Sequence, residues 1–247
     1  NLNPGTAYSV IVSSICPNND TSYNSSPISF TTNCLARIAP FTENFDSIFP
    51  ICWSQEDVSD DFDWTLNDGG TNSADTGPSD DITGGGSYMY TEASAPRDDG
   101  DFAIMYSENI DLTNLTNPML QFHTHMYGSA IGEIQIDVFN GNNYIPIFNK
   151  TGEKGDFWEE ENILIDPTLS STKFRITGIL SVDSDGETWP GDIAIDEFRV
   201  FEAIASDLEL YKGYSNSGCS LSSSEQVSVI IVNKGISPQT NFSVSYK

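Results

Sequence analysis

Short runs in which hydrophobic and polar residues alternate recur along the chain, separated by clusters of Gly, Asn, Asp, Ser and Pro. Side chains alternate between the two faces of a strand, so this period of two predicts half-buried β-strands. The longer period of helices is nearly absent. Strands are predicted at 7–14, 26–32, 86–92, 102–107, 118–127, 132–139, 143–148, 157–165, 172–180, 191–201, 207–213, 226–233 and 240–246. Many short strands with no predicted helix indicate an all-β protein, and sandwiches are favoured over a single barrel.

The pattern also divides the chain into three parts. Residues 1–34 resemble the C-terminal part of a fibronectin type III module, including Tyr8 at the start of the penultimate strand. Residues 206–247 resemble the N-terminal part of an immunoglobulin-like (CARDB-like) module. Two strands cannot bury a core alone. We therefore expect a piece of a longer modular protein, with one complete domain at residues 35–205 and neighbouring domains in the parent chain.

Charge is concentrated in the middle of the chain. Ten Lys and Arg against 36 Asp and Glu give a formal net charge of −26, nearly all of it within residues 35–206. This acidity argues against nucleic acid as a partner, because phosphate binding needs a basic surface. It also argues against anionic membrane surfaces. Membrane insertion is not predicted, since no apolar run reaches the roughly 18 residues of a membrane span.

Four cysteines are scattered among residues rich in Ser, Thr, Asn and Gly, at Cys16, Cys34, Cys52 and Cys219. No Cys-x-x-Cys pair is present, which argues against zinc-ribbon and thioredoxin-like sites. The composition is typical of an oxidising compartment. Four cysteines allow three complete pairings, and the sequence does not choose among them.

The middle domain carries a dense series of motifs. They are FTENFD at 41–46, PICW at 50–53, DDFDW at 60–64, TGPSDDIT at 76–83, YMYTEAS at 88–94, FHTHMYG at 122–128, GEIQIDV at 132–138 and GDIAIDEF at 191–198. Their order, spacing and content resemble the MAM domain, an extracellular module named for meprin, A5 protein and receptor phosphatase mu. The resemblance implies an antiparallel jelly-roll β-sandwich of the concanavalin A-like kind, with a role in adhesion and recognition and without catalysis. The flanking parts are similar to modules of large bacterial surface proteins.

Two positions depart from the family pattern. Ile82 stands where the Gly-Pro-x-x-Asp-His-Thr motif usually has His, and Cys34 and Cys52 lie 18 positions apart, farther than the family's first two cysteines. The resemblance still favours a Cys34–Cys52 disulfide, because this bridge would pin the first strand of the domain.

Clusters of Asp in several loops suggest a bound cation. Closely packed carboxylates repel one another, and Ca²⁺ accepts six to eight oxygen ligands in flexible geometry. Jelly-roll modules often hold such an ion where the first and last strands meet. The predicted ligands of Ca²⁺ are Glu43, Asp63, Asp80, Asp81 and Asp196. The alternative is an acidic surface that is merely solvated.

Catalytic and zinc-binding interpretations are weaker. Glu133 and Asp137 share one strand face, as in sandwich glycosidases, but the second Glu that such enzymes need is missing. His123 and His125 also share a face, without an evident third zinc ligand. The sequence contains no Gly-x-Ser-x-Gly elbow or phosphate loop. We therefore expect no enzyme.

Aromatic residues support a second kind of partner. Trp53 and Trp64 lie within the family motifs and are expected in the core, whereas Trp158 and Trp189 lie beside polar residues and could stack on sugar rings. The sequence thus predicts a non-catalytic adhesion or interaction module, stabilised by calcium, of a secreted or cell-surface protein. Its partner would be a cell-surface protein or glycan. The alternative is a carbohydrate-binding module of a secreted polysaccharide-acting protein.

Overall fold

The computed structural model describes residues 1–15, 17, 20–46, 48–215 and 227–245. The chain folds as two compact units, Asn1–Phe201 and Glu202–Lys247. All regular elements of the described residues are strands, so none of these residues belongs to a helix that could cross a bilayer. The predicted fold class, an all-β antiparallel jelly-roll sandwich, is confirmed by the strands and by their order in the sheets. The three-part division of the chain stays a prediction.

The strands match most of the sequence-predicted segments. Their bounds are β1 (Ala7–Val10), β2 (Ile28–Thr31), β3 (Arg37–Ile38), β4 (Phe41–Glu43), β5 (Ser54–Gln55), β6 (Thr65–Asn67), β7 (Tyr88–Thr91), β8 (Phe102–Tyr106), β9 (Ile110–Asp111), β10 (Pro118–Met126), β11 (Glu133–Phe139), β12 (Tyr144–Thr151), β13 (Gly155–Leu164), β14 (Ser171–Thr172), β15 (Phe174–Ile179), β16 (Ile193–Glu202), β17 (Leu208–Ser215) and β18 (Val227–Asn233). The predicted strand at 240–246 is wrong for its described residues, 240–245, which pair with no other strand of the described chain.

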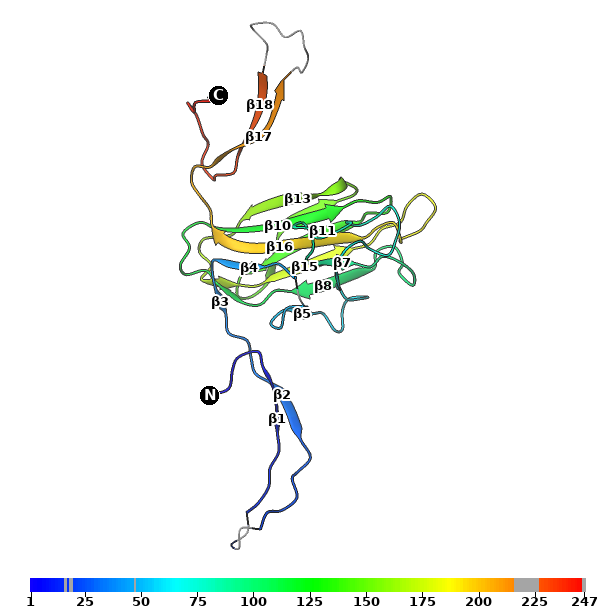
Figure 1. Ribbon diagram of the computed structural model, residues 1–247, viewed down its shortest axis with the longest axis vertical. Coiled ribbons are helices and arrows are strands. Elements are labelled where there is room, and N and C mark those ends of the chain that lie inside the picture. Colours follow the sequence, from blue (N-terminus) through cyan, green and yellow to red (C-terminus); the bar gives the residue numbers. More distant parts are fainter. Residues whose placement is uncertain (16, 18–19, 47, 216–226, 246–247) are drawn as a thin grey trace. The chain divides into compact units, whose positions relative to one another are not determined.

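Two stacked sheets form the sandwich (Figure 1). One sheet has the order β13-β10-β16-β7-β6, and the other has the order β12-β11-β15-β8-β5. The edge of β16 changes partner along its length: Ile193–Ile195 pair with β7, and Phe198–Val200 pair with β4. A small third sheet, β14-β9-β3, includes the parallel pair β3 and β9.

Aromatic side chains from both sheets meet in the core. Phe122 on β10 and Phe174 on β15 both contact Phe198 on β16, with ring centroids 6.2 and 5.3 Å from that ring. Trp53 packs edge-on against the same ring at 5.3 Å. Trp53 and Trp64 are buried, as predicted for the family motifs. Burial of these large apolar surfaces is the main force that holds the two sheets together.

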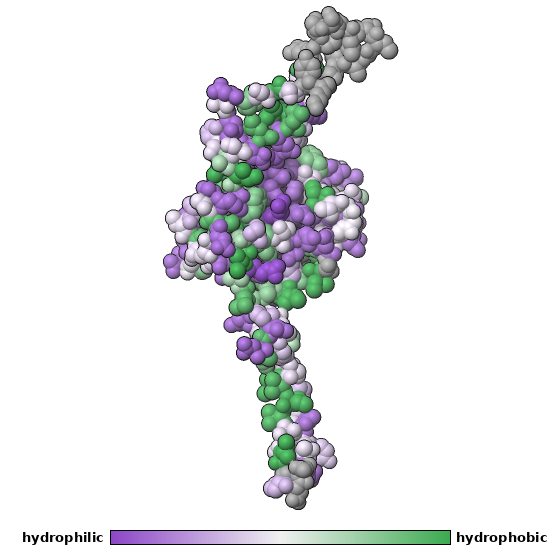
Figure 2. All heavy atoms as spheres, turned by 60° about the vertical axis from the view of Figure 1, so that its left-hand side comes forward, coloured by the Kyte–Doolittle hydropathy of each residue, from purple (hydrophilic) through white to green (hydrophobic). Residues whose placement is uncertain are grey.

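The N-terminal hairpin of β1 and β2 carries apolar side chains at its surface, among them Val10 and Ile28 (Figure 2). Tyr8 stacks on Phe30, and the Tyr8 hydroxyl accepts a hydrogen bond of 2.7 Å from the Asn3 N–H. A tyrosine that bonds to backbone a few residues upstream is the corner geometry of immunoglobulin-like sandwiches. The second unit contains the hairpin of β17 and β18.

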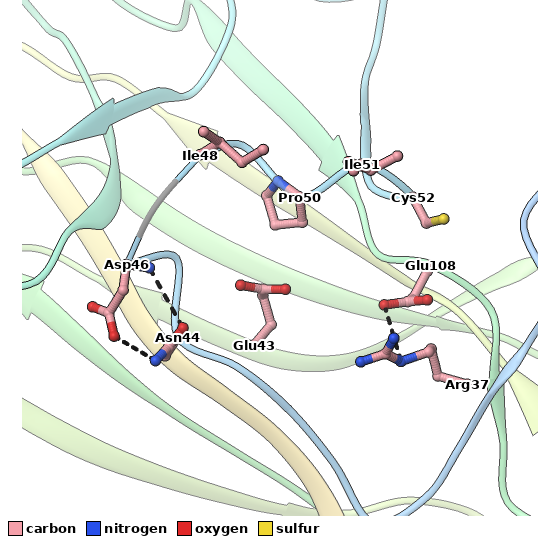
Figure 3. Close-up of a pocket in the computed structure, with 9 residues that line it drawn as sticks. All are labelled: Arg37, Glu43, Asn44, Asp46, Ile48, Pro50, Ile51, Cys52 and Glu108. Carbon is pink, nitrogen blue, oxygen red and sulfur yellow. Dashed lines mark hydrogen bonds and ion pairs between the residues drawn. The ribbon is translucent and has the colours of Figure 1, made fainter. Parts of the chain in front are cut away.

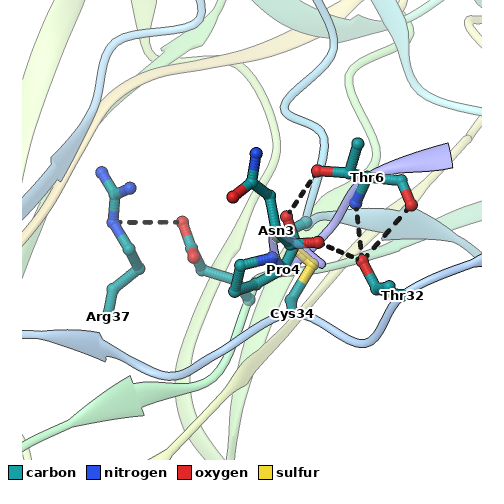
Figure 4. The surroundings of a disulfide bond; sticks show 8 residues. Asn3, Pro4, Thr6, Thr32, Cys34 and Arg37 are labelled. Atoms are coloured by element: carbon teal, nitrogen blue, oxygen red, sulfur yellow. Dashed lines mark hydrogen bonds and ion pairs between the residues drawn. A yellow bond between two sulfur atoms is a disulfide. The ribbon is translucent and has the colours of Figure 1, made fainter. Parts of the chain in front are cut away.

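A disulfide joins Cys34 to Cys52, with Cα atoms 5.9 Å apart, and this is the pairing that the family resemblance favours. The bridge lies beside the start of the N-terminal segment, where the Thr32 hydroxyl donates to the Asn3 carbonyl and accepts from the Thr6 N–H (Figure 4). Gly5, at φ 59°, lies against both sulfur atoms. The bridge therefore links the segment before β3 to the loop before β5. Cys16 and Cys219 lie outside the described residues.

Candidate functional site

Four loops at one end of the sandwich enclose a groove, which we call the Trp189 groove. It has a volume of about 540 Å³ and is lined by Asp75, Tyr127, Gly128, Ser129, Glu153, Asp183, Trp189 and Pro190. These residues come from the loops β6–β7, β10–β11, β12–β13 and β15–β16. The volume is within the range of small-ligand sites, and loops on a rigid scaffold are where proteins usually place such sites.

A close backbone approach holds two of these loops together. Gly128 has φ 143°, and a Cβ atom at this position would collide with the Pro190 carbonyl oxygen. The same carbonyl accepts a hydrogen bond of 3.1 Å from the Ala130 N–H. Because only glycine fits such a contact, the sequence at Gly128 fixes where the Trp189 loop lies.

The β6–β7 loop is tied to the same place. The hydroxyl of Thr76 and the N–H of Gly77 both donate to the Tyr127 carbonyl, at 3.0 and 3.1 Å. Asp75, one residue earlier, is exposed and has φ 57°, an uncommon conformation for a residue other than glycine. Such strained positions are enriched at functional sites. The groove is thus built from loops that backbone and hydroxyl contacts hold in place.

The groove combines an open indole with oxygen-rich polar groups. Trp189 is 39% exposed, and Tyr127 is half-buried beside it. Backbone N–H groups of Glu187 and Asp185 donate to Asp183 and hold its pKa below the usual range, so this carboxylate is ionised at neutral pH. An indole face with flanking carboxylates can stack on a sugar ring and accept hydrogen bonds from its hydroxyl groups. The same carboxylates would repel anionic ligands.

Trp158, the other aromatic candidate, is engaged within the fold. Its ring contacts Tyr88 and His125 at centroid distances of 5.7 and 5.4 Å, and its indole N–H donates to the Asp80 carbonyl at 3.1 Å. His125 is buried on the outer face of β10, where this cluster forms under the β6–β7 loop. Trp158 therefore anchors that loop, and Trp189 offers the more open surface.

Among the predicted calcium ligands, the structure brings Asp81 and Asp196 together. Asp81 is buried, which opposes its ionisation, but hydrogen bonds from Thr83, Gly86 and Gly85 outweigh burial and lower its pKa to about 2. Asp196 lies where β16 changes partner, and burial raises its pKa to about 7. It accepts only two backbone N–H bonds, and the charge of Asp81 raises its pKa further.

The other three predicted ligands lie apart from that pair or bond elsewhere. Asp80 accepts from the Asp81 N–H, and Glu43 on β4 accepts from the Phe45 N–H. Asp63 interacts with Asp60, whose carboxylate accepts from the β8 backbone. Within the described residues, no group of three or more His, Cys, Asp or Glu side chains is arranged so that it could hold a metal ion. The five residues do not converge as a set, and calcium binding stays a prediction.

Asp137 and Glu133, the two carboxylates considered for glycoside hydrolysis, are hydrogen-bonded to other side chains of the sheet. Asp137 is buried and accepts hydrogen bonds from Arg175, at 2.8 Å from Nε and 2.7 Å from Nη2. Glu133 accepts from the side-chain amides of Gln135 and Asn149. A buried, ion-paired Asp and an amide-bonded Glu explain these residues as parts of the sheet.

Sequence reasoning identified Trp189 but missed the rest of the groove. Asp75, Tyr127 and Ser129 are ordinary loop residues in the sequence, and their convergence depends on contacts between distant loops. Gly128, directly after a predicted strand, was the one available signal of a close backbone approach.

Comparison with known proteins identifies a family. A family model described as MAM domain, meprin/A5/mu, matches residues 44–203, which is more than half of the chain. Among curated proteins, the chain is 32% identical over 193 residues to MAM domain-containing glycosylphosphatidylinositol anchor protein 2 of Mus musculus, covering 70% of this chain and 20% of that protein. It is 33% identical over 158 residues to MAM domain-containing glycosylphosphatidylinositol anchor protein 1 of Gallus gallus, covering 60% of this chain and 16% of that protein. Neuropilin-1a of Danio rerio is 27% identical over 157 residues, covering 62% and 16%.

The chain thus spans about a fifth or less of the length of these relatives. They are vertebrate proteins and give no support to a bacterial source or to the two flanking module types, which stay predictions. Solved structures with a similar fold include the K1 cleaved adhesin domain of Lys-gingipain from Porphyromonas gingivalis W83, at 14% identity and a TM-score of 0.45, covering 66% of this chain and 97% of that one. A structure of carbohydrate-binding modules of the β-sandwich superfamily aligns at 12% identity and a TM-score of 0.41, covering 81% and 75%. These likenesses concern the fold alone.

Proposed function

The chain belongs to the MAM domain family, and on this premise we propose that it is a non-catalytic interaction module of a secreted or cell-surface protein. The family match across nearly the whole sandwich carries this proposal. The names of the anchor-protein relatives, which point to a glycosylphosphatidylinositol anchor, support a place outside the cell. The Cys34–Cys52 disulfide also supports an oxidising compartment.

The proposal is tested by measuring whether the chain binds cell surfaces. The fluorescently labelled 247-residue chain would be titrated onto a panel of vertebrate cells and followed by flow cytometry. We expect saturable binding that protease treatment of the cells removes, because the expected partner is a surface protein. Binding that does not saturate, or that is absent from every cell type, would contradict the proposal.

Glycan recognition is a second candidate function, and the Trp189 groove favours it. A 39% exposed indole beside a half-buried tyrosine provides a stacking surface, and Asp75, Glu153 and Asp183 provide acceptors for hydroxyl groups. Three carboxylates around the groove would exclude sulfated, sialylated and uronic acid-rich chains. The ligand class would therefore be a neutral glycan, consistent with a carbohydrate-binding module of a polysaccharide-acting protein.

Replacement of Trp189 tests this second function. On an array of neutral and anionic glycans, we expect Trp189→Ala to weaken binding to neutral glycans by about tenfold or more, since an aromatic contact of this kind carries much of the affinity. The melting temperature should change by no more than about 2 °C, because Trp189 is partly exposed. Phe157→Ala, which removes another exposed aromatic ring outside the groove, is the matched control and should leave glycan binding unchanged. Equal losses in the two variants, or binding of anionic glycans only, would rule out this role for the groove.

A further inference from the structure

A second concave surface lies next to the Cys34–Cys52 bridge and shares no residue with the Trp189 groove. This disulfide pocket has a volume of about 300 Å³ and is lined by Arg37, Glu43, Asn44, Asp46, Ile48, Pro50, Ile51, Cys52 and Glu108 (Figure 3). Its walls come from β3, from the end of β4 and the loop that follows it, and from the turn after β8. Elements far apart in the sequence therefore form one pocket.

A carboxylate with few partners lies on one wall of the disulfide pocket. Glu108 is only 8% exposed and points into the pocket, where none of the described donors is within hydrogen-bonding distance of its carboxylate. Its nearest cationic atom is Arg37 Nε at 3.9 Å, on a side chain that is 62% exposed. Charge-assisted hydrogen bonds normally span 2.7–2.9 Å, roughly 1 Å less. Arg37 thus makes only a long ion pair with this carboxylate, whose oxygens face the pocket and have room for a closer donor.

A second carboxylate faces the same space. Glu43 is half-buried and uses one oxygen to accept the Phe45 N–H at 2.9 Å. Burial raises the pKa of Glu108, the charge of Arg37 partly offsets this, and the charge of Glu43 raises the pKa again. The two glutamates therefore repel each other, and Arg37 compensates this repulsion only in part. A cationic group between them would relieve this repulsion and supply the missing donors.

The rim of the disulfide pocket is apolar and accessible. Ile48 and Ile51 are 61% and 72% exposed, on either side of Pro50. Arginine combines an aliphatic stem with a flat guanidinium that can donate to two carboxylates at once. A stem on the isoleucine rim with its head between the two glutamates matches the pocket in shape and in charge. A bare metal ion would match it less well, since the described residues contain no ligand group arranged for one.

We propose that the disulfide pocket binds an arginine side chain of a partner protein, with the guanidinium held between Glu43 and Glu108 and the stem on Ile48 and Ile51. The inference rests on the proposed function of the chain as a protein-interaction module. It defines the partner chemistry as a cationic side chain presented on a protein surface. The net charge of −26 would favour the approach of such a surface.

Nuclear magnetic resonance can test the pocket with a small probe. The oxidised, ¹⁵N-labelled chain would be titrated with N-acetyl-arginine amide and, in parallel, with N-acetyl-citrulline amide, a neutral analogue of nearly the same shape. We expect saturable shifts of amide signals from residues 43–46, 48–52 and 108 with the arginine probe. Citrulline should bind about tenfold more weakly or not at all, because it lacks the charge. The same titration with calcium chloride shows whether a metal ion occupies the pocket instead.

Variants make the assignment specific. Glu108→Gln should weaken arginine binding by about tenfold, and Glu43→Gln, at a more exposed position, gives a second reading if the first variant folds poorly. Glu153→Gln removes one carboxylate from the Trp189 groove and should leave the titration unchanged, which controls for the net charge. Equal binding of citrulline, equal binding by Glu43→Gln, or shifts spread evenly over the acidic surface would overturn the inference.

The outcome also separates this inference from the proposed function. If the chain binds cells but the arginine probe leaves the pocket signals unmoved, the pocket assignment fails and the interaction module stands. If the probe binds while no cell surface is bound, the pocket is real but the proposed function fails.

Discussion

Two neighbouring buried carboxyl groups, Asp81 and Asp196, have pKa values shifted in opposite directions. Both are buried, which disfavours the charged form, but Asp81 receives four hydrogen bonds and Asp196 receives two. Donors on the charged form outweigh burial for Asp81 and do not for Asp196. The local turn at Thr83, Gly85 and Gly86 therefore decides which of the two ionises first as the pH rises.

The shift of Asp196 predicts a dependence of stability on pH. Its ordinary pKa is 3.8 and its folded value is about 7, so the unfolded chain ionises first as the pH rises. The free energy of unfolding should therefore fall from about pH 4 to about pH 7, by at most about 4 kcal/mol from this group. Asp192, whose pKa burial raises to about 6, acts in the same direction. Denaturant unfolding of the chain at a series of pH values measures the slope.

Replacement of Asp196 isolates its part of the slope. Asp196→Asn has no proton to lose, so the fall in stability with pH should shrink, even if the variant is less stable throughout because its amide faces the Ile82 and Glu197 N–H groups. Asp185→Asn, on an exposed turn, is the control and should keep the wild-type slope. A slope that Asp196→Asn leaves unaltered would show that this carboxyl is ionised in the folded state.

At the scale of the elements, loop contacts shape the Trp189 groove. The strands supply a rigid frame, but the groove exists because the β10–β11 and β15–β16 loops touch at Gly128 and Pro190. The β6–β7 loop is hydrogen-bonded to the carbonyl of Tyr127, the residue directly before Gly128. A change at this junction should affect stability and ligand binding together.

Glycine substitutions test the junction. Gly128→Ala should lower the free energy of unfolding by about 2 kcal/mol or more, because a methyl group collides with the Pro190 carbonyl in addition to the strain of φ 143°. Gly141→Ala is the matched control: it also has positive φ, 94°, but no atom lies within 4 Å of its Cβ position. Its cost should be about 1 kcal/mol, from strain alone. Thermal unfolding compares the two, and equal losses would refute a packing role for Gly128.

The sequence predicted the long strands better than the short ones. β10 and β16 were predicted because they are nine and ten residues long, which gives the alternating sequence pattern room to show. Strands of two or three residues, such as β5, β6 and β9, are too short to show a period and are fixed by pairing with distant strands. The predicted strand at 240–246 had the right alternation but no partner among the described residues, and a strand without a ladder is not stable.

The sequence predicted core residues and the disulfide better than ligand-binding carboxylates, because the latter depend on contacts that are distant in the sequence or set by turn geometry. The family motifs located Trp53 and Trp64 in the core and favoured the correct bridge between Cys34 and Cys52. Counting acids predicted five calcium ligands without knowing which of them already had protein donors, as Asp81 does. Whether a carboxylate is free for a ligand depends on turn geometry, which composition does not reveal.

For the whole molecule, calcium stabilisation is a proposal that rests on the acidity of the chain and on Asp196. Of the two buried residues among the predicted ligands, Asp196 has fewer hydrogen-bond donors than Asp81. If calcium binds at Asp196, chelation should lower the melting temperature by about 5 °C or more, because an ion that binds only the folded state stabilises that state. The difference should disappear in Asp196→Asn. An unchanged melting temperature in chelator would leave the negative charge as a solvated surface.

The central claim is that this chain is an interaction module, and equilibrium binding to cell surfaces tests it most directly. Wild type and Glu108→Gln would be compared on the same cells, before and after protease treatment. The account predicts saturable binding by the wild type and loss of that binding after protease treatment. It also predicts that Glu108→Gln raises the dissociation constant by about tenfold. Absence of saturable binding by the wild-type chain would contradict the account.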